Sequence, residues 1–162
     1  LVLSACGGSD SDDSGSSDDE PAATTSDGTI DDVPPSGQAT ASVDGLDFAF
    51  DLPGGLACSI SDEALTYSYR IGDNEVTLGA GMNRVDGGWM GSIAMSIANP
   101  TGEQGPVGYY PAPGDLGVLD ESLIIVDGDT AMYEGPMLKQ PANDGSLPPP
   151  VDVGTGTVIA TC

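Results

Sequence analysis

Apolar and polar residues alternate along several short stretches of this chain. Leu46, Phe48, Phe50 and Leu52 occupy every second position of the first stretch. A period of two is typical of a β-strand with one buried face. The same alternation returns over residues 65–71, 76–82 and 89–97, and further strands are expected over 122–126, 130–133 and 156–162. No segment shows the spacing of an amphipathic helix, so the pattern predicts an all-β domain.

Turn-forming residues separate these stretches. Asp44-Gly45 suits a tight hairpin turn, and Pro53-Gly54-Gly55, Asp73-Asn74, Asp86-Gly87-Gly88 and Asp127-Gly128 mark further breaks. Short strands divided by turns at roughly ten-residue intervals are typical of an antiparallel sandwich or barrel. Residues 99–117 and 141–150 are rich in glycine and proline, and we expect them to form loops.

The first part of the chain differs sharply in composition. Between Cys6 and Ile30 it is dominated by serine, glycine and acidic residues, and no side chain there could anchor a core. We therefore expect residues 6–39 to be a disordered acidic linker, which charge repulsion extends, and residues 40–162 to be one β domain.

The 162 residues include 26 Asp and Glu but only three Lys and Arg, which gives a formal net charge of −23. Such a field repels phosphate backbones, so nucleic acid is excluded as a partner. The plainest interpretation of the acidity is solubility. Adaptation to salty surroundings and loose accumulation of cations are alternatives.

Histidine is absent from the sequence. This absence removes the commonest general base and metal ligand at neutral pH, and it excludes nucleophiles activated by histidine. Serine-lysine chemistry would require Lys139, the only lysine, and no neighbouring signal supports that role. The sequence therefore predicts no catalytic residues, no metal site and no cofactor.

The motif near the start of the chain is Leu3-Ser4-Ala5-Cys6. It resembles the bacterial lipobox, in which a branched apolar residue and two small residues precede a required cysteine. This resemblance implies a lipid on the Cys6 thiol, with residues 1–5 as the remnant of a signal peptide. It also implies that a membrane of the cell envelope is a partner and that the domain lies on its extracytoplasmic side.

Cys58 and Cys162 remain once Cys6 is assigned to lipid. An even pair of cysteines in an exported protein tends to oxidise, so we predict a disulfide between them. Two separate buried thiols are the alternative.

Several short stretches are similar to the mycobacterial LpqH-like lipoprotein antigen family. The matching stretches are 43–47, Leu56-Ala57-Cys58, Ile71-Gly72 and 158–162. The resemblance implies a lipobox, a linker, a compact β domain bridged by Cys58 and Cys162, and a surface antigen without known catalysis. The heavy acidity and the Tyr109-Tyr110-Pro111 segment depart from the family.

Other patterns have simpler structural interpretations. Gly79-Ala80-Gly81 and Gly154-Thr155-Gly156 lack the full phosphate-binding pattern and are expected to be strand glycines. Asp127-Gly128-Asp129 falls short of a calcium loop and is expected to be a hairpin. Asp120-Glu121 could supply paired carboxylates for glycoside hydrolysis, but acids are common enough here for chance pairing.

Aromatic residues are the remaining candidates for contact with a partner. Tyr109 and Tyr110 lie in the predicted loop, where exposed aromatic rings could anchor an interface, whereas Trp89 begins a strand and is expected in the core. We therefore expect a noncatalytic, membrane-anchored β module that binds a protein or another envelope component. A small envelope hydrolase or a ligand carrier is the alternative, and it would require a concave site with convergent polar groups.

Overall fold

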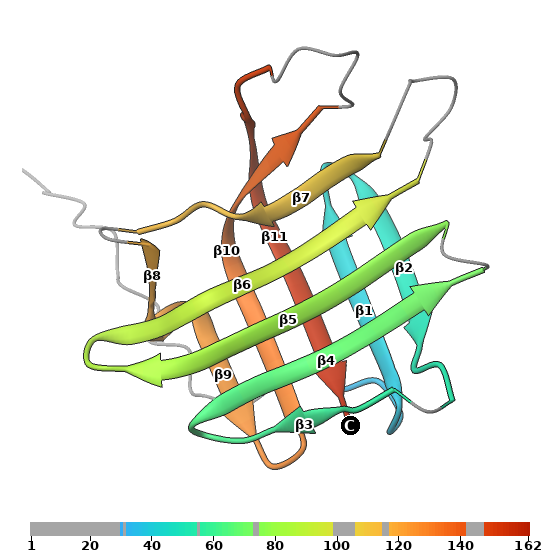
Figure 1. Ribbon diagram of the computed structural model, residues 1–162, viewed down its shortest axis with the longest axis vertical. Helices are drawn as coiled ribbons and strands as arrows, with labels where there is room; N and C mark the ends of the chain where they lie inside the picture. Colours follow the sequence, from blue (N-terminus) through green and yellow to red (C-terminus); the bar gives the residue numbers. More distant parts are fainter. Residues whose placement is uncertain are drawn as a thin grey trace, which may run out of the picture.

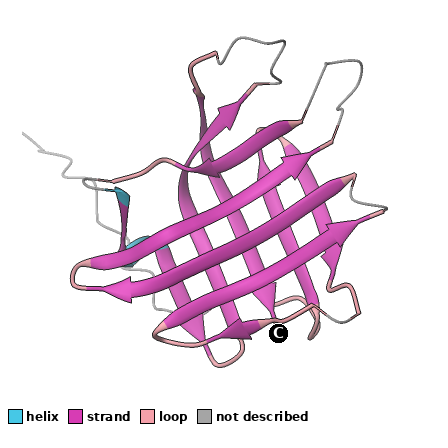
Figure 2. Cartoon of the chain, in the orientation of Figure 1, coloured by secondary structure: helices cyan, strands magenta, loops and turns pink. Residues whose placement is uncertain are grey.

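The computed structural model describes residues 30, 32–54, 56–72, 75–98, 106–114, 117–141 and 148–162. Cys6 and most of the predicted linker lie outside these residues. The strands are β1 (Gln38–Val43), β2 (Leu46–Asp51), β3 (Ser59–Ile60), β4 (Ala64–Ile71), β5 (Val76–Val85), β6 (Gly88–Ile97), β7 (Val107–Pro111), β8 (Val118–Asp120), β9 (Ile124–Asp127), β10 (Thr130–Gln140) and β11 (Val151–Thr161). The 3₁₀ turn η2 (Glu121–Leu123) joins β8 to β9. The predicted all-β class is confirmed (Figure 2).

Eight of the strands close into an antiparallel barrel. Their order around the wall is β11-β1-β2-β4-β5-β6-β7-β10, and pairing of β10 with β11 closes the circle. Outside this circle, β3 pairs with β4, β8 pairs with β6, and β9 pairs with β10. Closure removes most free strand edges, which otherwise invite aggregation. Figure 1 shows the front strands β4, β5 and β6 crossing the strands behind them at a steep angle.

The barrel has two ends, which we name after residues located there. The Asp44 end holds the β1–β2 hairpin turn, and β4, β6 and β10 finish there (Figure 1). The Cys162 end holds the β5–β6 and β9–β10 hairpins and the last residue of the chain. Asp44 and Gly45 both have positive φ, 54° and 71°, as the predicted tight turn requires. The turns at Asp86-Gly87 and at Asp127-Gly128-Asp129 are likewise observed.

Large side chains fill the interior of the barrel. Trp89 and Tyr69 are completely buried, and Tyr133 and Phe50 are almost so. Smaller apolar side chains of β1 and β11 pack among them. Each large side chain taken from water contributes roughly 1.5–3 kcal/mol, so this filled interior is the main source of stability. The predicted core position of Trp89 is confirmed.

Two strands form where loop or linker was predicted. Strand β1 begins at Gln38, inside the predicted linker, and its inward residues are the small Ala39, Ala41 and Val43. Their hydrophobic signal is weak, yet β1 pairs with β2 on one side and β11 on the other. Strand β7 lies inside the predicted loop 99–117, because Val107 and Tyr109 have an interior to fill.

The Cys58–Cys162 disulfide is present, as predicted, with the two Cα atoms 5.5 Å apart. It joins the last residue of the chain to the segment between β2 and β3. The barrel wall is thinly paired here, because β2 and β4 are paired only through Asp51 and Arg70. The buried Tyr69 hydroxyl reinforces the junction by donating a hydrogen bond to the Thr161 carbonyl at 2.9 Å.

The buried tyrosines predict a loss of stability in alkali. Burial raises the pKa of Tyr69 and Tyr133 to about 12, from an ordinary value of 10.0. The folded state therefore holds these protons more tightly than the unfolded chain does. The resulting stabilisation is fully present below about pH 10 and is lost as the pH rises towards 12.

Denaturant unfolding followed from about pH 9 to about pH 12 should show this loss, with tyrosinate absorbance appearing as the protein unfolds. A Tyr69→Phe, Tyr133→Phe variant should lose less stability over the same interval. Equal pH dependence in both proteins would contradict the assignment.

Candidate functional site

The barrel wall between β6 and β10 is built from two separate pieces. Near the Asp44 end, β7 bridges them by pairing with residues 95–97 of β6 and 137–140 of β10. Near the Cys162 end, β8 pairs with residues 88–90 of β6, while β9 pairs with residues 130–133 of β10. Among the described residues, 91–94 of β6 therefore have a strand partner only on the β5 side. The wall is interrupted at this point.

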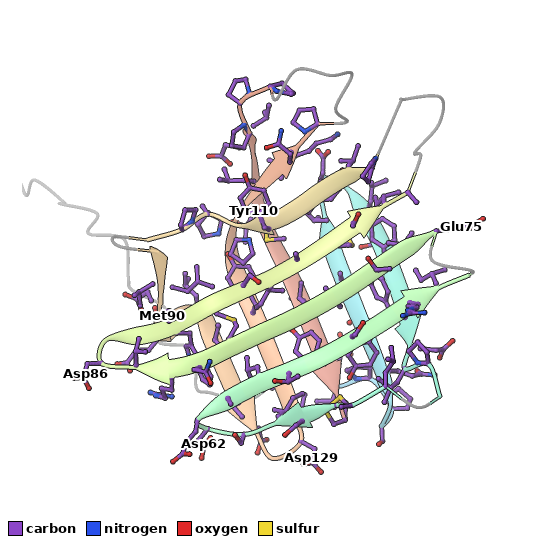
Figure 3. All side chains as sticks on the ribbon, viewed as in Figure 1. Asp62, Glu75, Asp86, Met90, Tyr110 and Asp129 are labelled. Atoms are coloured by element: carbon purple, nitrogen blue, oxygen red, sulfur yellow. A yellow bond between two sulfur atoms is a disulfide. The ribbon has the colours of Figure 1, made fainter. Side chains whose placement is uncertain are left out.

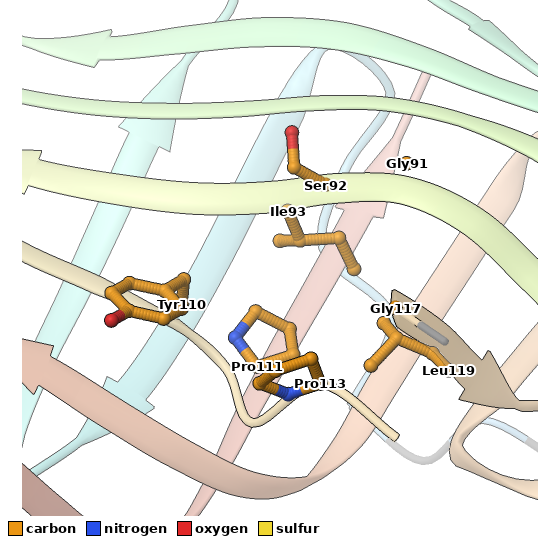
Figure 4. Close-up of a pocket in the computed structure, with 8 residues that line it drawn as sticks. All are labelled: Gly91, Ser92, Ile93, Tyr110, Pro111, Pro113, Gly117 and Leu119. Carbon is orange, nitrogen blue, oxygen red and sulfur yellow. The ribbon is translucent and has the colours of Figure 1, made fainter. Parts of the chain in front are cut away.

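A pocket of about 220 Å³ occupies this interruption, and we call it the wall pocket. Its lining comes from β6, from β7 and the residues after it, and from β8 with the residue before it (Figure 4). The lining residues are Gly91, Ser92, Ile93, Tyr110, Pro111, Pro113, Gly117 and Leu119. Of these described residues, only Ser92 and Tyr110 bring polar side-chain atoms, so this lining is mainly apolar.

The inner and outer parts of the wall pocket differ in exposure. Ile93 and Leu119 belong to the barrel interior, with 2% and 4% of their surface exposed. Tyr110 is half-buried and Pro113 is exposed. Met90, which precedes the unpaired part of β6, is 52% exposed (Figure 3). Apolar surface therefore continues from the core, through the wall, to solvent.

Glycine lets the backbones approach closely beside the wall pocket. Gly91 has a φ of 136°, and a Cβ there would overlap the carbonyl oxygen of Gly81 on β5. A Cβ on Gly114 would overlap the carbonyl oxygen of Val118 in the same way. Glycine at these positions permits the path that the chain takes around the pocket.

A charged cluster lies at the Asp44 end of the barrel. Lys139 Nζ donates to Asp44 Oδ2 at 3.2 Å and lies 5.7 Å from the centroid of the Tyr109 ring. The Tyr109 hydroxyl lies 3.4 Å from the same carboxylate oxygen. The hydrogen bond to Asp44 raises the pKa of Lys139, and burial raises the pKa of Tyr109. These groups satisfy one another, so we assign the cluster to structure.

A similar arrangement lies near the Cys162 end. Arg84 donates to Glu121 at 3.0 Å, and its guanidinium carbon lies 5.6 Å from the centroid of the Trp89 ring. Both charged side chains are substantially exposed, so this ion pair contributes little to stability. The buried Nε1 of Trp89 has no hydrogen-bond partner within the described residues.

A second hollow, of about 470 Å³, lies on the outer wall over β1, β2 and β11. Its outward-facing residues are mostly small and include Thr40, Ser42, Ala49 and Thr157. The strands beneath it are continuously paired, so their backbone groups are already bonded to one another. It offers a ligand fewer unused hydrogen-bonding groups than the interrupted part of β6 does.

The two tyrosines expected to contact a partner are placed differently. Tyr109 lies in β7 rather than in a loop and is only 2% exposed, because alternate residues of this strand face the interior. Its ring is therefore withheld from a partner, which corrects the expected exposure. Tyr110 faces outward and lines the wall pocket. Its role in partner binding stays a prediction.

The remaining candidate residues from the sequence do not come together in one site within the described part of the chain. Asp120 accepts hydrogen bonds from the hydroxyl and backbone N–H of Ser122, which lower its pKa, and Glu121 pairs with Arg84. These two acids therefore make local contacts at the corner between β8 and β9. Gly79 and Gly81 lie inside β5, and Gly154 and Gly156 inside β11, as strand glycines.

Sequence reasoning missed most of the wall pocket. Tyr110 was singled out for its aromatic ring, but Ile93, Leu119 and Pro113 gave no local signal. They come from three segments that only the barrel topology brings together. The signal that was present is Gly91, a glycine within an otherwise regular strand, which often marks a bulge or a close backbone approach.

No group of three or more Asp, Glu, Cys or His side chains that could hold a metal ion occurs within the described ranges. Those same ranges contain no helix of the length and apolar character needed to cross a bilayer. Comparison of the chain with protein-family models, curated proteins and solved structures gave no match.

Proposed function

We propose that this chain is an exported lipoprotein, anchored through Cys6 to a membrane of the cell envelope, whose barrel is a noncatalytic module for binding a partner on the extracytoplasmic side. The observation that carries the anchor is the Leu3-Ser4-Ala5-Cys6 motif followed by an acidic, serine-rich segment. Acyl chains contribute about 0.8 kcal/mol per buried methylene, so two or more of them hold a protein firmly.

The disulfide supports export. Disulfides persist mainly in oxidising compartments outside the cytosol, and Cys58–Cys162 leaves Cys6 as the one cysteine outside the bridge. The same bridge is implied by the resemblance to the mycobacterial LpqH-like lipoproteins, and we propose kinship with that family. Its surface-antigen role would fit a module displayed beyond the membrane.

The interior of the barrel favours binding over catalysis. Side chains such as Tyr69, Tyr133 and Met137 occupy the space where a carrier barrel would hold its ligand. The described carboxylates are spread over turns and strands, and none of them lines the wall pocket. A hydrolase or ligand carrier, the second candidate, requires a concave site with convergent polar groups.

The anchor is tested by the intact mass of protein extracted from membranes after expression with a complete export signal. We expect the mass of the chain beginning at Cys6 plus a diacylglyceryl group, with further acylation in hosts that modify the amino terminus. Reduction should add only the mass of two hydrogen atoms. A Cys6→Ser variant should lack the lipid and leave the detergent phase on partitioning.

The matched control is Ser4→Ala, which keeps a small residue before the modified cysteine and should retain the lipid. A wild-type protein with an unmodified Cys6 thiol, recovered in the aqueous phase, would refute the anchored-lipoprotein assignment. Lipid retained by the Cys6→Ser variant would show that the anchor lies at another residue.

A further inference from the structure

We propose that the wall pocket and the unpaired part of β6 bind an extended, basic segment of a partner protein, with one apolar side chain of that segment seated in the pocket. This inference rests on the partner-binding role proposed above and specifies its site and the chemistry of the partner. It uses three independent features: an open strand edge, a pocket sized for one side chain, and the charge of the molecule.

The open edge supplies main-chain hydrogen bonds. In an antiparallel ladder, successive residues direct their N–H and C=O groups alternately to the two sides of the strand. Within residues 91–94, every second residue therefore points these groups away from β5, to a side where no strand of the described part of the chain is paired. An extended segment can bond to such groups by strand addition, a common mode of peptide recognition.

The pocket supplies selectivity for one apolar side chain. Its volume of about 220 Å³ is below the range of roughly 300–1,000 Å³ that drug-sized ligands occupy. A Leu, Ile or Pro side chain could enter it and contact Ile93 and Leu119. An extended peptide presents every second side chain to the same face, so one residue could enter the pocket while its neighbours bond to β6.

The rim of the pocket has the composition of an interface. Tyr110 forms one wall, and the flexible side chain of Met90 is exposed at the end of the unpaired region. Tyrosine and methionine are enriched at protein interfaces, where they bury a large apolar area. Figure 4 shows Tyr110, Pro111 and Pro113 on one side of the hollow and Ile93 of β6 on the other.

Charge selects a basic segment over an acidic one. The chain carries 26 acidic residues against three basic ones. Lys139 and Arg84 are paired with Asp44 and Glu121, so these cations are already neutralised. Asp120, next to the pocket residue Leu119, is an exposed carboxylate and adds negative charge beside the pocket. Lysine or arginine beside the seated apolar residue would therefore be attracted.

The test uses the mature full-length protein and a defined probe. The probe is a short synthetic peptide in which valine alternates with lysine or threonine around a central leucine. A second peptide, which has glutamate in place of lysine, tests whether binding depends on positive charge. Two further peptides test main-chain bonding. In each of them one of the two sets of alternate residues is N-methylated, so that the peptide lacks the N–H groups along one of its two edges.

We expect the lysine peptide to shift the backbone amide resonances of residues 91–94, Tyr110 and Leu119. The glutamate peptide and one of the two N-methylated peptides should bind roughly tenfold more weakly or worse. Tyr110→Ala, which removes one wall, and Ser92→Phe, which places a ring over the opening, should each weaken binding by roughly tenfold. The matched control Thr66→Ala, on the exposed face of β4, should bind as the wild type does.

Shifts confined to the hollow over β1, β2 and β11 would overturn the proposal, and so would full binding by both pocket variants. Equal binding of both N-methylated peptides would refute recognition of the strand edge, and equal binding of the glutamate peptide would refute the basic partner. The lipid test on Cys6 is independent of these results. A lipidated protein that binds none of the peptides would remove this site and leave the anchored-lipoprotein assignment standing.

Discussion

Loss of the Cys58–Cys162 disulfide is expected to lower the free energy of unfolding by about 4 kcal/mol, in a Cys58→Ser, Cys162→Ser variant or after reduction. The bridge closes a loop with a sequence separation of 104 residues. Closing so long a loop removes much conformational entropy from the unfolded chain, which is why the expected effect is large. Unfolding in denaturant at neutral pH measures it directly.

The local consequence should appear at one seam of the barrel. Strands β2 and β4 share only the Asp51–Arg70 pair, whereas β4 and β5 are paired along their whole length. Without the bridge, amides near Asp51 and Arg70 should exchange with solvent faster than those of the β5–β6 hairpin.

The control for this experiment is Cys6→Ser, because Cys6 takes no part in the bridge. This variant is compared with wild-type protein that carries no lipid. It should leave the unfolding free energy unchanged. A loss below about 1 kcal/mol in the double variant would mean that the β2–β4 seam is held by packing alone.

The sequence predicted the fold class because the barrel uses strong local signals. Alternation such as Leu65, Tyr67 and Tyr69 marks an interior face, and Asp44-Gly45 and Asp127-Gly128 mark hairpins. The bridge was also predictable, from cysteine number and expected export. Each of these inferences depends only on residues that are close in the sequence or on the number of cysteines.

What the sequence could not show depends on pairing between distant segments. The inward face of β1 carries two alanines, so its place in the wall is fixed by β2 and β11 rather than by its own hydrophobicity. The burial of Tyr109 and the outward position of Tyr110 follow from the register of β7. The wall pocket exists only because β7 and β8 share one edge of β6 without meeting.

The second large effect is expected at Gly91, where β5 and β6 come close beside the wall pocket. A Gly91→Ala variant should lose about 3 kcal/mol of unfolding free energy. Its φ of 136° is a conformation that residues with a Cβ rarely adopt, and the added methyl would overlap the Gly81 carbonyl oxygen. Both obstacles are backbone, so no side-chain rotation can relieve them.

Gly81→Ala is the matched control, because Gly81 lies on the adjacent strand and a Cβ there meets nothing within 4 Å. It should be neutral or stabilising by a few tenths of a kcal/mol, since alanine restricts the unfolded chain more than glycine does. Thermal and denaturant unfolding of both variants measure the difference. Equal stability of the two would mean that β6 can shift away from β5 at this point. In that case the geometry of the unpaired edge, and with it the proposed peptide site, would be adjustable rather than preformed.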